Sequence, residues 1–225
     1  MSKLPNRSEI SDKTIYRLSV YYRCLVGLDK EGATTVSSDT LSSLAGVKPT
    51  QLRKDLTHFG QFGTRGLGYD VRGLLTMVGE LIGASGELQP VVLIGVGNLG
   101  TALLSYGGFA SEGFRIVAAF DQDAERPRDG RITAPIHPME ALPKTIRQEG
   151  IHIAILTVPT SAAQEVAESL IGLGITGILN FAPTVLTVPS FVRVRNVNLA
   201  IELENLGYYT RQTQGVETLQ NGAAQ

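Results

Sequence analysis

Apolar residues recur at helical spacing through the first third of the chain and in short continuous runs through the rest. The first predicted helix begins after Ser11-Asp12 and ends at Gly32. One of its faces carries apolar residues three or four positions apart, namely Ile15, Leu18, Tyr22, Leu25 and Leu28. This pattern predicts an amphipathic helix packed against a core.

Two short helices separated by a tight turn are predicted next. A β segment at residues 34–36 precedes a helix that starts at Ser38-Asp39, and Gly46-Val47-Lys48 forms the turn. Pro49 stands where the first position of the following helix belongs, and that helix runs to Thr57. Residues 16–55 therefore read as a helix-turn-helix arrangement.

The segment after the helix-turn-helix predicts a wing. Glycines alternate with aromatic residues from Phe59 to Tyr69, as in a tight β-hairpin, before a helix from Val71 to about Ile82. Between Ala45 and Arg72 five basic residues face two acidic ones, a net charge of +3, although the whole chain carries −1. The side chains expected to contact DNA are Lys48, Thr50, Gln51, Arg53, Lys54, Arg65 and Tyr69. A solvated surface with a plain glycine-rich loop is the alternative.

The second part of the chain carries a dinucleotide-binding pattern. The apolar run from Pro90 to Ile94 predicts a strand buried on both faces, and a helix follows at about Thr101. Between them stands G-x-G-x-x-G, as Gly95, Val96, Gly97, Asn98, Leu99 and Gly100. The first glycine permits the turn, the second lets a pyrophosphate approach, and the third lets the helix pack closely.

An acidic residue ends the second predicted strand, which runs from Phe114 to Phe120. Asp121 is placed to accept hydrogen bonds from the adenosine ribose, and Asp123 is a weaker candidate for this role. A carboxylate there repels a 2′-phosphate, which favours NAD(H) over NADP(H). A related fold that binds another adenine nucleotide, such as a coenzyme A thioester, remains the alternative.

Further strands are predicted at residues 152–158, 177–180 and 192–197, with a helix at about 161–173. Ligands bind at the carboxyl ends of such strands, which makes Thr157, Val158, Pro159, Asn180 and Ala182 candidate neighbours of the nicotinamide. A part-helical segment from Asn198 to about Gln212, interrupted at Gly207, is expected to cap its own domain or reach a partner subunit. Residues 216–225 are expected to form a frayed tail.

Composition limits the remaining possibilities. The 225 residues contain one cysteine, which excludes an intramolecular disulfide, and the three histidines have no cysteine partners for a zinc site. No metal is expected. The start has no apolar signal core and no apolar run is long enough to span a membrane, so a cytoplasmic protein is expected. An NAD-dependent dehydrogenase would need a general acid or base, and His58, His137 and His152 are poorly placed to act as one.

The combined motifs resemble the Rex family of redox-sensing transcriptional repressors. The resemblance rests on Tyr21-Tyr22-Arg23, on residues 36–38, on 51–56 with Phe59-Gly60, on 63–69, and on 95–100 with Tyr106. The expected fold is α/β with two domains, a winged helix-turn-helix at 1–84 and a Rossmann-like parallel sheet at 85–197. A C-terminal helix and tail at 198–225, exchanged within a dimer, completes it.

The resemblance also implies a function. It implies a homodimer that binds operator DNA when NADH is low and releases it when NADH binds, with NAD⁺ competing. It places Tyr106 near the nicotinamide, and it pairs the first-helix arginine, here Arg23, with an acidic residue near the start of the C-terminal helix. This sequence has Asn198 there, which allows a hydrogen bond with Arg23 but no ion pair.

Overall fold

The chain folds into two compact units, Met1–Glu87 and Leu88–Gln225. The computed structural model describes residues 10–60, 67–84, 86–126, 131–132 and 134–222, with side chains up to residue 211. Each unit has its own buried apolar core.

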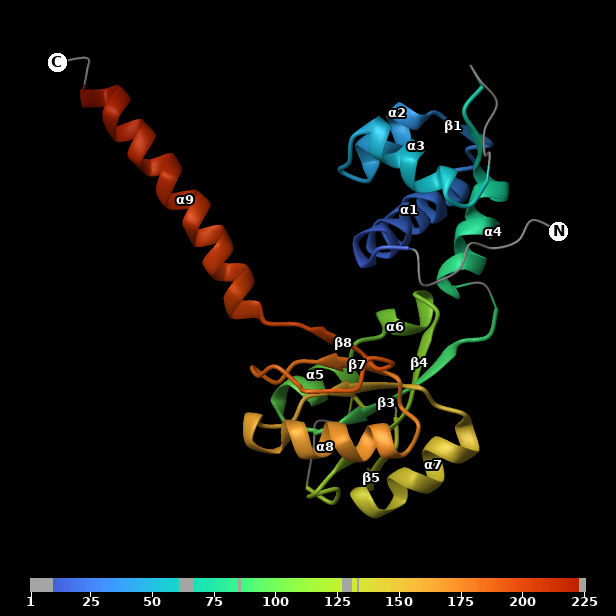
Figure 1. The fold of residues 1–225 in the computed structure, drawn as a ribbon, viewed down its shortest axis with the longest axis vertical. Helices are drawn as coiled ribbons and strands as arrows, with labels where there is room; N and C mark the ends of the chain where they lie inside the picture. The colour runs from blue at the N-terminus through green and yellow to red at the C-terminus, as the bar shows by residue number, and fades with distance from the viewer. Residues whose placement is uncertain (1–9, 61–66, 85, 127–130, 133, 223–225) are drawn as a thin grey trace. The chain divides into compact units, whose positions relative to one another are not determined.

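The first unit contains four helices and two short strands in its described residues (Figure 1). They are α1 (Asp12–Lys30), β1 (Thr35–Val36), α2 (Ser38–Leu44), α3 (Pro49–Thr57), β2 (Tyr69–Asp70) and α4 (Val71–Ile82). The predicted helix starts are explained by side-chain caps, because Ser11, Ser37 and Asp70 each accept a hydrogen bond from a backbone N–H in the first turn. The helix-turn-helix arrangement follows from α2, the turn at Gly46 and α3.

The predicted wing is described only at its base. Residues 61–66, including Arg65, lie outside the described residues. Tyr69 of β2 pairs with Val36 of β1 in antiparallel register. Gly68 has φ of +81°, and a Cβ there would collide with the carbonyl of Val36. Only glycine fits this close approach of two backbones.

The second unit is built on a six-stranded parallel sheet in the order β5-β4-β3-β6-β7-β8. The strands are β3 (Gln89–Ile94), β4 (Phe114–Asp121), β5 (Ile136–Pro138), β6 (Ile153–Leu156), β7 (Gly177–Asn180) and β8 (Arg193–Asn196). Numbered along this unit, the order is 3-2-1-4-5-6, which is that of a Rossmann fold. The order reverses beside β3, and ligands of such sheets bind at this switch point.

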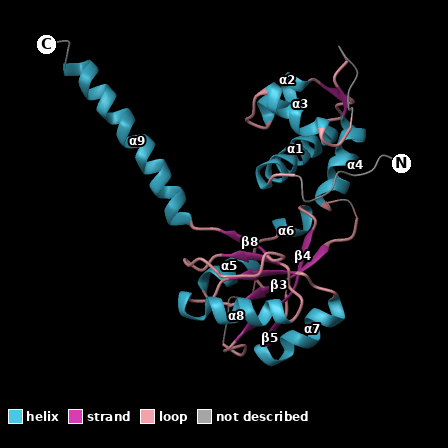
Figure 2. Ribbon diagram, in the orientation of Figure 1, coloured by secondary structure: helices cyan, strands magenta, loops and turns pink. Residues whose placement is uncertain are grey.

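Helices cover both faces of the sheet (Figure 2). Val92 and Ile94 of β3 face one core, to which α7 (Leu142–Glu149) and α8 (Thr160–Gly172) contribute. Val91 and Leu93 face the other, with α5 (Asn98–Leu104) and α6 (Gly108–Ser111). Burial of alternate residues on both faces explains why residues 90–94 of β3 form an uninterrupted apolar run.

The C-terminal segment differs from the prediction. Helix α9 (Leu199–Gly222) passes through Gly207 without interruption and includes residues 216–222, which were expected to form a frayed tail. Gly207 is not among the described glycines with positive φ, so its backbone continues the helix. A single glycine weakens a helix by about 1 kcal/mol but need not end it.

Candidate nucleotide site and DNA-reading face

The three glycines of the loop between β3 and α5 have different surroundings. Gly95 has φ of +93°, and a Cβ there would lie 2.9 Å from the backbone of Thr157. A Cβ on Gly100 would collide with the carbonyl of Gly95. A Cβ on Gly97 would meet nothing within 4 Å. Gly95 and Gly100 therefore serve the packing of the loop, whereas Gly97 leaves its open side free for a ligand.

Two side chains at the ends of β4 and β6, the strands on either side of β3, hold this loop in place. Asp121, at the end of β4, accepts hydrogen bonds from the N–H of Val96 (2.5 Å) and of Asp123 (2.8 Å). Thr157, after β6, donates its hydroxyl to the carbonyl of Gly95 at 2.6 Å and also lies 3.1 Å from that of Ile94. The protein's own hydrogen bonds thus fix the loop on both sides, which lowers the entropic cost of binding a ligand there.

A cavity of about 610 Å³ opens beside the glycine loop. This volume lies within the range of about 300–1,000 Å³ typical of small-molecule sites. Among the predicted nucleotide-binding residues, its lining includes Gly95, Val96, Gly97, Asp121, Thr157 and Val158, together with Pro159. The sequence predicts a ligand site at the carboxyl ends of β3, β4 and β6, and the cavity lies there.

Other predicted residues lie apart from this lining. Asn98, Leu99 and Tyr106 are exposed, and the ring of Tyr106 packs edge-on against Phe109 with centroids 5.1 Å apart. Asn180 is fully buried, and its amide nitrogen donates to Asn196 and to the carbonyls of Ala182 and Thr184. Its oxygen accepts from the N–H of Ala182. Asn180 therefore folds the loop after β7 and does not present its amide to the cavity, contrary to the expectation.

The lining also includes residues that the sequence analysis missed. Gln122 and Arg126 follow β4, Met139 follows β5, and Ser161, Ala162 and Val166 belong to α8. Gln122 and Arg126 could have been found, because they follow the strand that ends in Asp121. The contribution of Met139 depends on β5, a strand of three residues that the hydrophobic pattern does not reveal.

The outward face of α3 carries the polar residues of the first unit that are suited to DNA. Thr50, Arg53, Lys54 and Thr57 are exposed, and their spacing of three and four places them on one side of the helix. Lys48, just before the helix, is exposed as well. Leu52 and Leu56 are buried on the opposite side. Thr57 was not predicted, although it continues the same spacing.

Two residues predicted to contact DNA are directed inward. Tyr69 is 6% exposed and belongs to the core of the first unit, where its hydroxyl lies 3.4 Å from that of Ser38. Its assignment to the DNA surface is wrong, because the short pair β1–β2 turns its ring into the core. Gln51 is half-buried and donates its amide to Asp55 at 2.9 Å, rather than extending outward with Thr50.

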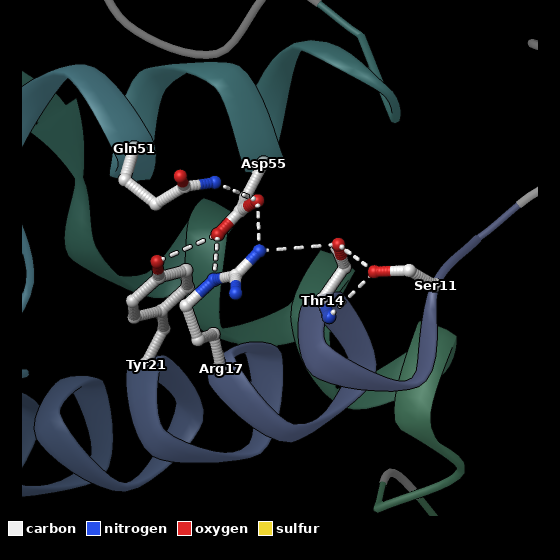
Figure 3. A network of polar contacts seen from close by, with 6 residues as sticks. All are labelled: Ser11, Thr14, Arg17, Tyr21, Gln51 and Asp55. Atoms are coloured by element: carbon white, nitrogen blue, oxygen red, sulfur yellow. Dashed lines mark hydrogen bonds and ion pairs between the residues drawn. The ribbon is translucent and has the colours of Figure 1, made fainter.

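The carboxylate of Asp55 lies at the centre of a network of polar contacts in the first unit (Figure 3). Burial acts to raise its pKa, but hydrogen bonds from Arg17, Tyr21 and Gln51 outweigh burial and hold the pKa below its ordinary value. The pKa of Tyr21 is raised by burial and by its hydrogen bond to Asp55. Asp55 is therefore ionised at neutral pH, and Tyr21 is protonated.

Comparison with known proteins covers both units. Residues 9–57 match the family described as "Putative DNA-binding protein N-terminus", and residues 87–184 match the "CoA binding domain" family. The chain is 44% identical over 218 residues to the redox-sensing transcriptional repressor Rex of Streptomyces coelicolor, covering 96% of this chain and 83% of that protein. It is also 44% identical to Rex of Carboxydothermus hydrogenoformans, covering 91% and 98% of the two chains.

The chain belongs to the Rex family of redox-sensing transcriptional repressors. Family membership agrees with a regulator and not with an enzyme. A solved structure of RSP in complex with β-NAD⁺ and operator DNA matches this Rex-family chain with a TM-score of 0.82 at 33% identity, covering 94% and 97% of the two chains. RSP in complex with β-NADH matches with a TM-score of 0.80 at 31% identity, covering 94% and 99%.

The two residues assigned to an interdomain switch belong to different units of this Rex-family chain. Arg23 lies on the exposed side of α1. Asn198 precedes α9, and its side-chain oxygen accepts hydrogen bonds from the N–H of Ala200 (3.0 Å) and Ile201 (3.4 Å). Asn198 is thus an N-cap of α9, a role that an aspartate fills equally well.

Two further observations concern the described residues of this Rex-family chain. No three His, Cys, Asp or Glu side chains among them lie close enough together to hold a metal ion. None of their helices combines the length and the apolar character needed to cross a membrane.

Proposed function

We propose that this Rex-family repressor binds NADH and NAD⁺ in the cavity beside its glycine loop. Gly97 supports the proposal most directly, because its open side leaves room for a pyrophosphate next to backbone N–H groups. Asp121 would accept hydrogen bonds from the adenosine ribose. Thr157 and Val158 would lie toward the nicotinamide, and the family resemblance adds Tyr106 there.

We propose that the outward face of α3 reads operator DNA. Arg53 and Lys54 supply positive charge, and Thr50 supplies a hydroxyl. All three lie on the exposed side of α3, the second helix of the helix-turn-helix. Arg65 in the predicted wing would contact the phosphate backbone. A protein that binds operator DNA would work in the cytoplasm, where the bacterial DNA lies.

We propose that the chain acts as a homodimer that exchanges α9 between subunits. The large apolar side chains of α9 support this, because all of them in its described part are more than half exposed within the single chain. They are Leu199, Ile201, Leu203, Leu206, Tyr208 and Tyr209. A partner subunit would cover a surface that a single chain leaves in water.

The proposed regulation follows from the two redox forms of nicotinamide, which differ in charge and ring planarity. A ligand shifts a two-state protein only through different affinities for the two states. NADH would favour a dimer whose α3 helices do not match the spacing of operator half-sites, and NAD⁺ would favour the matching spacing or leave it unchanged. A hydrogen bond between Arg23 and Asn198 would serve in place of an ion pair.

Coenzyme A thioesters are the second candidate class of ligand, because residues 87–184 match the "CoA binding domain" family.

The direct test of the ligand is the mobility of operator DNA at fixed salt concentration, with NADH, NAD⁺ or acetyl-CoA added in turn. The proposal predicts that NADH releases the DNA, that NAD⁺ counteracts NADH, and that acetyl-CoA has no effect. Release by acetyl-CoA alone would identify a coenzyme A thioester as the effector and contradict the proposal.

A further inference from the structure

A buried polar network joins α1 to α3 (Figure 3). Its centre is Asp55, which is 1% exposed on the inner side of α3. Arg17 approaches in a bidentate manner, with Nε 2.6 Å from Oδ2 and Nη2 2.8 Å from Oδ1. The Tyr21 hydroxyl donates to Oδ2 at 2.8 Å, and the Gln51 amide donates to Oδ1 at 2.9 Å. Each carboxylate oxygen thus accepts two hydrogen bonds, which uses its full capacity.

The network continues to the beginning of α1. Nη2 of Arg17 also donates to the Thr14 hydroxyl at 3.2 Å, and this hydroxyl lies 2.9 Å from that of Ser11, the N-cap of α1. The Arg17 guanidinium is therefore held by α1 on one side and by Asp55 on the other. These contacts fix its position against Asp55.

Stability alone does not account for such an arrangement. Removing a charged pair from water is costly, and apolar residues of similar size often stabilise a protein equally well or better. Directional bonds supply what apolar contacts do not, namely a defined rotation and register of one helix against another. Arg17 and Tyr21 of α1 both bind the Asp55 carboxylate, which Gln51 of α3 orients, and this leaves α3 little freedom to turn about its axis against α1. Because side chains project outward from the helix axis, a rotation of α3 about that axis would redirect Arg53 and Lys54.

We propose that Arg17, Tyr21 and Gln51 act through Asp55 as positioning residues for DNA reading. They hold α3 in the rotation that directs Arg53 and Lys54 outward. Gln51 contributes to operator specificity through Asp55 and not by contact with a base. This inference depends on the proposed DNA-binding function of α3.

The first unit offers a matched comparison. Arg72 of α4 and Asp29 of α1 also form an ion pair, at 2.9 Å, but the Arg72 side chain is 85% exposed and the pair does not involve α3. Exposed pairs of this kind contribute little. Tyr16 on α1 is 73% exposed, whereas Tyr21 is fully buried. Variants at Arg72 and Tyr16 therefore control for the loss of an ion pair and of a tyrosine hydroxyl.

The test uses the full chain and a duplex that the wild-type protein enriches from a random-sequence library. Dissociation constants are measured at fixed salt concentration for this duplex, for a scrambled duplex, and for a panel with single base-pair changes. The double variant Arg17→Met/Asp55→Leu is expected to remain folded and to keep its NADH affinity. Its preference for the enriched duplex over the scrambled one should fall roughly tenfold or more. The control Arg72→Met should keep the wild-type preference.

Conservative variants keep the inference testable if the double variant fails to fold. Tyr21→Phe should lower the preference roughly threefold or more, and Tyr16→Phe should not. Gln51→Met should weaken discrimination at several base pairs, as expected of a helix that has rotated about its axis. Loss confined to one base pair would show that Gln51 reads a base. That result, or a folded Tyr21→Phe variant with unchanged preference, would overturn the inference. A wild-type chain that enriches no duplex would contradict the proposed function itself.

Discussion

Among the three glycines of the nucleotide loop, Gly97 is the one whose side-chain position faces open space. Gly95 and Gly100 lie against the backbone, so substitution at either position would disturb the loop itself. Gly97 has φ of −75°, which any residue adopts without strain. A substitution at Gly97 therefore tests the ligand site without testing the fold.

We expect Gly97→Asp to abolish NADH binding and leave DNA binding intact. The new carboxylate would occupy the space proposed for the pyrophosphate and repel its charge. The measurement is operator mobility with increasing NADH, and an increase in the NADH dissociation constant of at least 100-fold is expected, about 3 kcal/mol. Gly172→Asp is the matched control, because a Cβ on Gly172 also meets open space, at the end of α8. If NADH still released the DNA from the Gly97→Asp variant, the proposal that the glycine loop binds NADH would be wrong.

At the scale of elements, the stability of the packing between α1 and α3 should depend on pH. The pKa of Asp55 is lowered in the folded chain, so its stabilising contribution is complete above its unfolded pKa of about 3.9. The contribution is lost as the pH falls through the lower, folded pKa. Asp55→Asn removes the carboxylate and should destabilise the first unit by about 1–3 kcal/mol at pH 7.

Hydrogen exchange of the α3 amides, corrected for intrinsic exchange rates, measures this effect. The difference in protection between wild type and Asp55→Asn should be constant from pH 7 to about 5 and should shrink toward pH 3. Asp29→Asn, in the exposed pair with Arg72, should change the protection little. A wild-type advantage that stays undiminished at pH 3 would contradict the ionised network.

The proposed contact of the outward face of α3 with DNA is tested by a substitution at Arg53. Arg53→Ala should weaken binding to the enriched duplex by roughly 1–3 kcal/mol and binding to a scrambled duplex by less, because a base contact is lost. Arg147→Ala, in the last turn of α7 in the other unit, is the control for removal of an exposed arginine. Equal losses on both duplexes would make Arg53 a phosphate contact. No loss on either would remove the outward face of α3 from the DNA site.

The elements differ in how readily the sequence predicts them. Strand β3 and the glycine loop are predictable, because an apolar run followed by three spaced glycines has few other structural solutions. β5 (Ile136–Pro138) and α7 (Leu142–Glu149) were missed, since one is three residues long and the other has a proline at its start and mostly polar residues. The full length of α9 was missed because Gly207 suggests a break that the local signal cannot confirm.

Side-chain direction is less predictable than the elements. The periodicity of α3 places Leu52 and Leu56 inside, as observed. It does not reveal that Asp55, which accepts a hydrogen bond from Gln51 of its own helix, also binds Arg17 of α1, because Asp55 and Arg17 are 38 positions apart in the chain. Tyr69 was misassigned for a similar reason, since its burial depends on pairing with Val36 in β1. Long-range pairing of this kind leaves no periodic signal.

At the scale of the whole molecule, the proposed reading and sensing functions belong to different compact units. The first, Met1–Glu87, carries α3, and the second, Leu88–Gln225, carries the glycine loop and α9. Redox control therefore requires that a ligand in one unit change the free energy of DNA binding by the other. Linkage makes this coupling reciprocal, because a ligand that weakens DNA binding is itself weakened by DNA to the same extent.

The NADH dissociation constant of the full chain, measured with and without a saturating amount of the enriched duplex, tests this coupling most directly. We expect the duplex to raise this constant by the same factor by which saturating NADH raises the dissociation constant of the duplex. A typical coupling of 1–3 kcal/mol corresponds to roughly 5- to 150-fold. An NADH dissociation constant that is the same with and without the duplex would contradict the account.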